Sequence, residues 1–449
     1  MPHDAMNLNL WPIDTRRNER GAVEIGGQAL DVLAETFGTP LYVFSEAELR
    51  DNCRAVRDAF SDAWPRTRVV YAGKAGLNGT LIRILVEEGL GLDVVSGGEL
   101  ALAIAAGVDP AEISFHGNNK GEDELREAVR AGVGKVVVDN LDEIDRLARI
   151  AAAEETTVSI LIRLNPGVDV HTHHKISTGI VDSKFGFPIQ NGQARGAVER
   201  ALAHESLRVV GYHAHIGSQL FESEAYIDTV DALVGFGAAM RDEFGVEMQH
   251  LSPGGGFGIA YLDEDEPKPA RYWAGVIAGS VRSACDRHGM PDPVLTIEPG
   301  RSIVGPAGVA VYRVGSIKEI PGIRTYVAVD GGMADNIRPS LYDARYTAVV
   351  ANRDAEGAGE REVAVVGKYC ESGDILIERI ALPDVAVGDL LAVPACGAYC
   401  LPMASNYNGA LRPAVILVSP SGARVMKRRE TYDDLLRHDP ALLLTPASS

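Results

Sequence analysis

Between residues 44 and 305, short apolar runs alternate along the chain with amphipathic stretches. The apolar runs are rich in valine and isoleucine and predict buried strands, while apolar positions three and four residues apart predict helices such as Glu122–Val133 and Leu141–Ala153. The predicted strands are Arg68–Tyr71, Gly91–Val95, Ile113–His116, Lys135–Asp139, Ser159–Leu164, Val209–His215, His250–Ser252 and Val294–Glu298. Eight strands that alternate with helices predict an α/β fold, a (β/α)8 TIM barrel.

A polar residue or a glycine stands at the end of each predicted strand. In a (β/α)8 barrel the working side chains come from these carboxyl ends, which open on one face. The residues concerned are Lys74, Asp93 and Ser96, His116 and Asn118, Asp139, Arg163, His215, Gly254–Gly256 and Glu298. Because buried strands are otherwise apolar, this arrangement favours a functional site over packing.

After Glu298 the pattern changes to β-type runs broken by glycine and proline, which predicts a C-terminal antiparallel β domain over residues 306–449. Its predicted strands are Val309–Val314, Thr325–Val329, Glu362–Val366, Leu390–Pro394 and Ala414–Val418. Residues 1–43 contain one further strand-like run, Ala22–Ile25, and a second, Leu41–Phe44, begins at the end of this segment. We expect this segment to pack with the β domain, and residues 44–305 to form the barrel.

Composition narrows the function classes. The chain has 43 Lys and Arg and 62 Asp and Glu, which gives a formal net charge of −19. This negative charge disfavours binding to nucleic acid or to an anionic membrane. Five cysteines without a Cys-x-x-Cys pair disfavour a disulfide framework or a structural zinc site. The sequence has no pattern typical of a signal peptide and no apolar run of membrane-spanning length, so we expect a cytoplasmic protein.

Two motifs near the last predicted strands could bind an anion. Pro253–Gly258 contains four glycines, whose missing Cβ atoms would let backbone N–H groups approach a phosphate, although a glycine-rich turn without a ligand is equally compatible. In Glu298-Pro299-Gly300-Arg301, the arginine could complete a phosphate site or bind a carboxylate. The alternative is a salt-bridged rim of the barrel.

Three other features carry open alternatives. His213 and His215 share one face of a strand and could bind a metal or stack on a flat cofactor, but no carboxylate stands at ligand spacing, and the His171–His174 cluster lies in a predicted loop. Lys74 could form a Schiff base if burial or a nearby cation lowered its pKa, or be an ordinary surface lysine. Cys370-Glu371-Ser372-Gly373-Asp374 is, by itself, a polar turn.

These segments together resemble the fold type III family of pyridoxal-phosphate (PLP) decarboxylases, with an alanine racemase-like fold, and most closely the diaminopimelate decarboxylases. The resemblance runs from Leu10-Trp11-Pro12 to Ser405-Asn406-Tyr407-Asn408. Its most specific stretches are Asp93-Val94-Val95-Ser96-Gly97-Gly98-Glu99, Arg163-Leu164-Asn165-Pro166, Ser183-Lys184-Phe185-Gly186, His215-Ile216-Gly217-Ser218-Gln219 and Ile337-Arg338-Pro339-Ser340-Leu341-Tyr342-Asp343.

The resemblance implies how pyridoxal 5'-phosphate would be held. Lys74 would carry it as a Schiff base, His215 would stack on its ring, and Glu298 would pair with the ring nitrogen, where related racemases have an arginine. The residues implied at its phosphate are Ser218, Gly256, Arg301 and Tyr407, and those implied elsewhere around the cofactor are Asp93 and Gly300.

The resemblance also implies a reaction, the decarboxylation of meso-2,6-diaminopimelate to L-lysine and CO2, the last step of lysine biosynthesis. Cys370 would donate the proton that replaces the lost carboxylate, and Glu371 would bind the distal ammonium. The residues implied at the distal carboxylate are Arg301, Arg338 and Tyr342, and Tyr407 would touch substrate as well as cofactor. Cys370 and Glu371 would come from the neighbouring subunit, which implies a homodimer.

The chain departs from the family pattern at Gly76, where asparagine is usual, and at Lys368, where proline is common. Three rival interpretations remain at this stage. A decarboxylase of ornithine, lysine or another diamino acid would leave Arg338 and Tyr342 without a carboxylate partner. The other two are a noncatalytic PLP-binding relative and a metal-dependent barrel hydrolase that uses His213 and His215.

Overall fold

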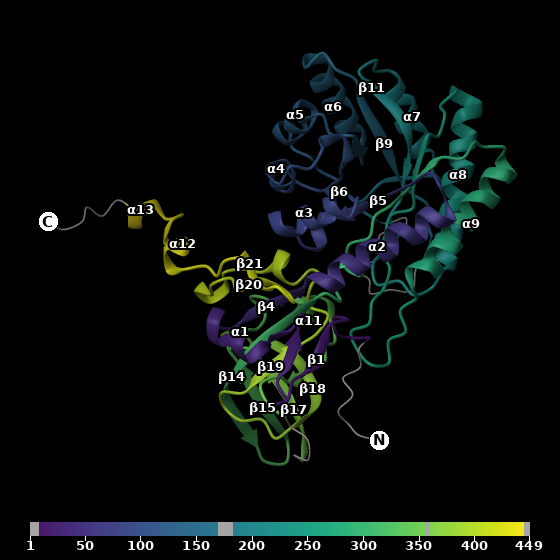
Figure 1. Ribbon diagram of the computed structural model, residues 1–449. Coiled ribbons are helices and arrows are strands. Elements are labelled where there is room, and N and C mark those ends of the chain that lie inside the picture. The colour runs from purple at the N-terminus through teal and green to yellow at the C-terminus, as the bar shows by residue number, and fades with distance from the viewer. Residues whose placement is uncertain (1–8, 169–182, 355–358, 444–449) are drawn as a thin grey trace. The chain divides into compact units, whose positions relative to one another are not determined.

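The computed structural model describes residues 9–168, 183–354 and 359–443 (Figure 1). It divides into two compact units. The barrel unit consists of Arg50–Ile259 and Glu266–Ile303, and the β unit consists of Met1–Leu49, Ala260–Asp265 and Val304–Ser449. The His171–His174 cluster lies outside the described residues.

The barrel unit contains a closed barrel of eight parallel strands, and its helices lie outside the strands (Figure 1). The strands follow the chain in the order β5 (Thr67–Ala72), β6 (Gly91–Val94), β7 (Ile113–Phe115), β8 (Lys135–Val138), β9 (Val158–Asn165), β11 (Leu207–His213), β12 (His250–Ser252) and β13 (Val294–Ile297). Pairing of β13 with β5 closes the barrel, and the short strand β10 (Phe187–Pro188) pairs with β9. All eight predicted strands and the barrel are confirmed.

Three helices of the barrel unit begin at a residue whose polar side chain caps them. The barrel helices are α2 (Glu46–Ala63), α3 (Gly79–Glu87), α4 (Gly97–Ala105), α5 (Glu122–Ala131), α6 (Leu141–Ala153), α7 (Gln193–Leu202), α8 (Glu224–Phe244) and α9 (Ala270–His288). Asn78, Ser96 and Asn140 accept hydrogen bonds from the first-turn amides of α3, α4 and α6. These caps fix the ends of the loops that leave β5, β6 and β8.

Helix α5 ends two residues earlier than the amphipathic pattern predicts. Gly132 follows it with φ of 76°, a left-handed conformation that glycine adopts without steric cost, and its N–H donates to the carbonyl of Ala128. The predicted helix Leu141–Ala153 has the same bounds as α6.

The β unit is built on a sheet in the order β18-β17-β15-β14-β4-β20-β21, with β19 on β14 and β16 on β19. Its strands are β4 (Leu41–Ser45), β14 (Gly308–Ile320), β15 (Arg324–Val329), β16 (Val349–Val350), β17 (Glu360–Val366), β18 (Ile375–Pro383), β19 (Leu390–Val393), β20 (Ala414–Ser419) and β21 (Gly422–Lys427). Pairing is antiparallel except between β15 and β17 and between β4 and β20. Strand β4 therefore carries an early part of the chain into the middle of a sheet made from its last third.

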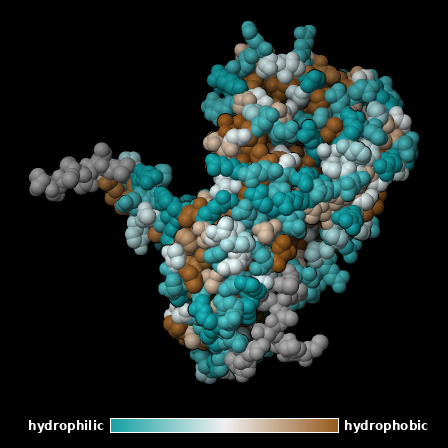
Figure 2. Space-filling view, in the orientation of Figure 1, coloured by the Kyte–Doolittle hydropathy of each residue, from teal (hydrophilic) through white to brown (hydrophobic). Residues whose placement is uncertain are grey.

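Smaller elements complete the β unit. They are β1 (Thr15–Arg17), β2 (Val23–Ile25), β3 (Gln28–Ala29), α1 (Leu30–Phe37), α11 (Arg338–Tyr342), α12 (Tyr432–Leu436) and α13 (Pro440–Leu443). Apolar side chains of β2, α1 and β4 form one buried core with those of β14, β19 and β20. On the face drawn in Figure 2, hydrophilic side chains are interspersed with smaller hydrophobic areas. Within the described parts of the chain, no helix combines the length and the hydropathy needed to cross a bilayer.

Candidate active site

The turn that carries Lys74 follows β5 and is held on both sides. The Tyr71 hydroxyl donates to the carbonyl of Gly76 at 2.8 Å, which closes the turn. A Cβ added at Gly300 would lie 3.1 Å from the Cβ of Ala72, so the loop after β13 packs directly against this turn. Lys74 is exposed, and its positive charge acts with burial to lower the pKa of His215. The lysine therefore lies at the carboxyl end of the barrel near His215.

Glu298 is the centre of a buried polar cluster at this end of the barrel. His213 Nε2 donates to Glu298 Oε2 at 2.9 Å, and the Ser252 hydroxyl donates to Oε1 at 2.8 Å. Burial alone would raise the pKa of Glu298, but the two imidazoles of His213 and His116 and these hydrogen bonds bring it below its ordinary value. Glu298 is thus held ionised in a water-poor site.

Asp93 belongs to the same cluster and has the opposite character. Burial and the negative charge of Glu298 raise its pKa well above the ordinary value. Its Oδ1 atom is buried and makes no hydrogen bond within the described part of the chain. Two carboxyl groups whose pKa values are driven apart in this way are typical of a functional site.

His116, which follows β7, joins the two carboxyl groups. Its Nε2 atom lies 3.8 Å from Asp93 Oδ1 and 3.7 Å from Glu298 Oε1, and its ring meets that of His213 edge to face at 4.8 Å. Burial lowers its pKa well below the ordinary value. Sequence reasoning placed His116 at a strand exit but gave it no role, because its partners come from strands far apart in the chain.

The same cluster tests the alternative interpretation that His213 and His215 bind a metal ion. Donor atoms of His116, His213 and Glu298 lie within 4.8 Å of one another, so the structure groups His213 with these residues. His213 Nε2 and Ser252 already engage both oxygens of Glu298. The arrangement is therefore that of a hydrogen-bonded acid–base cluster.

The glycine turn after β12 packs tightly against the neighbouring strand exits. An added Cβ at Gly255 would lie 1.9 Å from the carbonyl oxygen of Glu298, and one at Gly256 would lie 2.2 Å from that of Gly217. Gly254 and Gly256 also have φ of 83° and 100°, which favour glycine. The amides of Gly255 and Gly256 donate to no acceptor in residues 9–168, 183–354 or 359–443. Close packing explains the glycines and leaves these donors available.

Arg301 lies beside this turn. Its Nη2 and Nε atoms donate to the Ser218 hydroxyl at 3.0 and 3.3 Å, and the arginine side chain is buried. A buried guanidinium, a hydroxyl and unused backbone amides form a corner suited to a phosphate group. Together with the ionised Glu298 and the accessible amine of Lys74, this corner fits pyridoxal phosphate, which carries an anion, a ring nitrogen and an aldehyde.

In the β unit, the turn that carries Cys370 and Glu371 stands on a buried base. Both side chains are exposed, whereas Asp374 is buried and accepts hydrogen bonds from the amides of Met333 at 2.6 Å and Tyr369 at 2.8 Å. These bonds fix the start of the turn.

Two further bonds hold neighbouring candidate residues near this turn. The Cys370 amide donates to Asn408 Oδ1 at 3.0 Å, which places Tyr407 close by, and the Ser340 hydroxyl donates to the carbonyl of Gly373 at 2.6 Å. Ser340 belongs to α11, which also bears Arg338 and Tyr342. The structure therefore gathers the predicted substrate residues of the β unit at one edge of it.

Lys368, one of the two departures from the family pattern, has a structural reason. Its backbone N–H donates to the carbonyl of Gly331 at 3.2 Å, a hydrogen bond that proline could not make. Gly331 precedes the segment that supplies the Met333 amide, so this bond also supports the turn.

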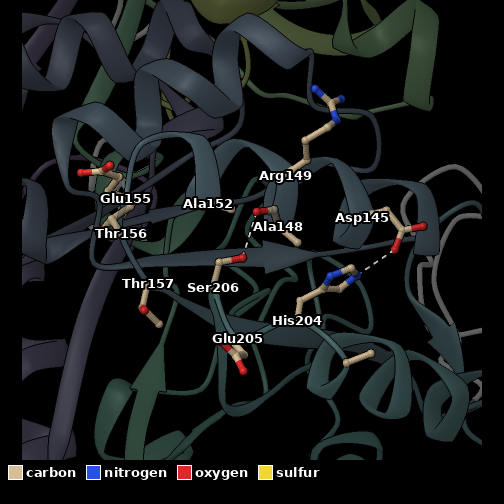
Figure 3. A pocket seen from close by; sticks show the side chains of 11 residues that line it. Asp145, Ala148, Arg149, Ala152, Glu155, Thr156, Thr157, His204, Glu205 and Ser206 are labelled. Atoms are coloured by element: carbon tan, nitrogen blue, oxygen red, sulfur yellow. Dashed lines mark hydrogen bonds and ion pairs between the residues drawn. The ribbon is translucent and has the colours of Figure 1, made fainter.

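A cavity of about 640 Å³ lies elsewhere on the barrel unit (Figure 3). It is lined by the end of α6 and by the loops that lead into β9 and β11, and its polar contacts include His204 Nε2 with Asp145 Oδ1 at 3.1 Å. These loops stand at the amino ends of the strands. In such barrels that face contributes to stability, whereas catalysis occurs at the other.

The geometry agrees with what this chain is similar to. Residues 46–305 match the family model described as "Pyridoxal-dependent decarboxylase, pyridoxal binding domain". Fold and site thus define a PLP-dependent decarboxylase with an alanine racemase-like fold.

The individual relatives described next are all diaminopimelate decarboxylases. The chain is 46% identical over 425 residues to diaminopimelate decarboxylase of Bacillus subtilis, covering 95% of this chain and 97% of that protein. The enzyme of Mycobacterium tuberculosis is 44% identical over 437 residues, with 95% and 97% covered. A crystal structure of diaminopimelate decarboxylase from M. jannaschii with L-lysine has a TM-score of 0.89 and 34% identity, covering 98% and 99% of the two chains. The chain belongs to the diaminopimelate decarboxylase family.

Proposed function

We propose that the protein is a PLP-dependent carboxy-lyase that converts meso-2,6-diaminopimelate to L-lysine and CO2, the last step of lysine biosynthesis. The observation that carries this proposal is the buried Glu298, with its lowered pKa, at the same end of the barrel as the exposed Lys74, on a chain so similar to diaminopimelate decarboxylases. When bound, pyridoxal phosphate supplies an electron sink that accepts the electron pair left by departing CO2. A protonated ring nitrogen strengthens this sink, and the carboxylate of Glu298 is suited to hold that proton.

The remaining barrel residues position the cofactor in this proposal. Lys74 binds it covalently, and His215 lies against the ring. The residues at its phosphate are Ser218, Gly256, Arg301 and Tyr407. Asp93, in its neutral form, adds no second negative charge beside Glu298, and Gly300 allows the loop of Arg301 to pack on the Lys74 turn.

The β unit supplies the substrate contacts in this proposal. Cys370 donates the proton that replaces the carboxylate, and Glu371 binds the distal ammonium. The residues at the distal carboxylate are Arg301, Arg338 and Tyr342, with Tyr407 also in contact with substrate. The exposure of Cys370 and Glu371 supports a homodimer in which the neighbouring subunit supplies both side chains.

Two broader assignments complete the proposal. Residues 44–305 act as the cofactor-binding domain, and residues 306–449 together with residues 1–43 act as the β domain. A cytoplasmic location and the absence of nucleic-acid or membrane partners stay predictions from the composition.

The test is CO2 release by the purified protein with added PLP, from meso-diaminopimelate, L-lysine, L-ornithine and L-arginine in parallel. We expect release from diaminopimelate alone, with L-lysine as the product. Release mainly from L-ornithine or L-lysine would keep the mechanism and move the substrate, and release from none would favour a noncatalytic PLP-binding protein.

A further inference from the structure

In the described part of the chain, Arg338 is a buried cation without a carboxylate partner. Its side chain is 6% exposed, yet no carboxylate lies within ion-pair distance of it in the described residues. Two other buried cations have carboxylate partners: Lys120 Nζ lies 2.6 Å from Glu143, and Arg163 lies 3.7 Å from Asp139. Because burying a charge without a partner is costly, Arg338 calls for an anion from outside the described chain.

Two tyrosine rings hold the guanidinium of Arg338. Its central carbon lies 4.7 Å from the ring centre of Tyr261 and 5.4 Å from that of Tyr346. The two rings meet edge to face at 5.4 Å and 88°, so they form a fixed corner. Arg338 Nη1 also donates to the Tyr346 hydroxyl.

The direction of this hydrogen bond is set by the arginine. Arginine can only donate, so the Tyr346 oxygen accepts and its own proton points onward to Cys400 Sγ, 3.6 Å away. The Cys400 thiol in turn donates to the carbonyl of Ala398 at 3.6 Å. Tyr346 and Cys400 are both buried. A chain of hydrogen bonds therefore runs from Arg338 through Tyr346 to Cys400, which also shares a hydrogen bond with Cys396.

This arrangement leaves part of the guanidinium unused. Only Nη1 has a hydrogen-bond partner among residues 9–168, 183–354 and 359–443, so the Nε and Nη2 groups can still donate. Two adjacent N–H groups in a plane match the two oxygens of a carboxylate. The cage fixes which edge of Arg338 is presented.

We propose that Tyr346 and Cys400 are positioning residues that hold Arg338 in one orientation and thereby select a substrate with a carboxylate at the end distal to the reacting centre. This inference rests on the proposed function and extends it to residues that touch no substrate. A substrate with only an amine at that end leaves the buried guanidinium unpaired, which is the costly case.

The experiment compares ligands that differ only in the distal carboxylate. L-Lysine, the product, keeps that carboxylate, and cadaverine lacks it. Their dissociation constants are measured on the holoenzyme from the change in cofactor absorbance, together with kcat and KM for meso-diaminopimelate. The variants are Tyr346→Phe, which removes one hydroxyl and keeps the ring, and Cys400→Ala. Tyr326→Phe is the matched control, since Tyr326 lies 5.9 Å from the guanidinium of Arg324 without holding a site residue.

For Tyr346→Phe we expect KM and the L-lysine dissociation constant to rise about tenfold, the usual effect of losing a hydrogen bond to a charged group, with kcat within about twofold. Cadaverine binding stays unchanged, Cys400→Ala gives a smaller rise of the same kind, and Tyr326→Phe behaves like the wild type. Equal losses for L-lysine and cadaverine, or no loss in either variant, would overturn the inference. Wild-type protein that releases no CO2 from meso-diaminopimelate would instead overturn the proposed function itself. If Tyr346→Phe does not fold, Cys400→Ala decides the matter.

Discussion

The carboxyl end of the barrel and the Cys370 edge of the β unit hold their polar side chains in opposite ways. At the barrel end, Asp93, His116, His213 and Glu298 are buried and act on one another through hydrogen bonds and charge. At the β-unit edge, the buried residues are the supports, such as Asp374, while Cys370, Glu371 and the 37% exposed Tyr407 face outward.

This difference indicates which half of the candidate site, the barrel end or the β-unit edge, is complete within one unit. At the barrel end, the orientation and ionisation of the polar side chains are set by residues of the barrel strands themselves, as a preorganised cofactor site requires. The β-unit edge offers reactive groups on a rigid base, and nothing in the described part of that unit encloses them. We therefore expect the first half to keep its chemistry without a partner, and the second half to act only once another surface covers it.

The largest expected effect comes from a substitution in the β-unit edge that leaves the barrel end intact. Cys370→Ala should lower kcat by about 10²- to 10⁴-fold, the usual range for a positioned proton donor, while cofactor absorbance stays normal. Lys74→Ala should abolish activity and covalent cofactor binding. Co-expression of the two inactive variants should restore about a quarter of wild-type activity, because half of the dimers formed at random contain one intact site.

This complementation distinguishes sharing between subunits from a site built within one chain, which would leave the mixture as inactive as its parts. Cys285→Ala, in the buried face of α9, is the control for loss of a thiol. An unchanged kcat for Cys370→Ala would remove this residue from the reaction.

The sequence predicts the two halves unequally well. The eight barrel strands are buried on both faces, so each is a clear apolar run between polar ends, and their exits locate Lys74 and Glu298. Strand β21 is missed because it is largely exposed, and β18 because Glu378-Arg379 interrupts it. Two site-level features give no local signal.

These features are the role of His116 and the cage around Arg338. His116 depends on strands β6 and β13. Arg338 depends on Tyr261, more than seventy residues earlier in the chain, and only the folded chain brings these groups together. Propensity and periodicity report local structure and burial, so pairings of this range lie beyond them.

A second prediction concerns the base of the β-unit edge. Asp335 accepts hydrogen bonds from the hydroxyls of Tyr312 at 2.6 Å and Tyr42 at 3.1 Å, and burial raises its pKa to about 6. A raised folded-state pKa stabilises the fold fully below about pH 4, and this contribution is lost as the pH rises through about 6.

Urea unfolding of Asp335→Asn measures this contribution. Relative to the variant, the wild type should lose about 3 kcal/mol of unfolding free energy between pH 4 and pH 7, because two pKa units correspond to about that energy. The exposed Asp433→Asn should follow the wild type. A pH-independent difference between the wild type and Asp335→Asn would show that Asp335 is ionised throughout.

The smallest expected effect tests the barrel end and has the opposite sign. Burial lowers the folded-state pKa of His116 well below 6.5, so the fold is at full stability above about pH 6.5 and loses this contribution as the pH falls, because the unfolded state then binds the proton. The wild type should therefore be less stable at pH 5 than at pH 8. His116→Gln should remove that acid sensitivity, and its unfolding free energy at pH 8 should differ from that of the wild type by a fixed amount. The exposed His438→Gln should keep the wild-type dependence of stability on pH.

The cluster also predicts a spectral change in His116→Gln, because Glu298 and Asp93 lose the imidazole that lies within 4 Å of both. The absorbance of bound cofactor in this variant should therefore depend on pH differently from the wild type. Acid sensitivity equal to that of the wild type would mean that His116 is charged in the folded barrel, and the two halves of the site would then not differ in the way their ionisation is set.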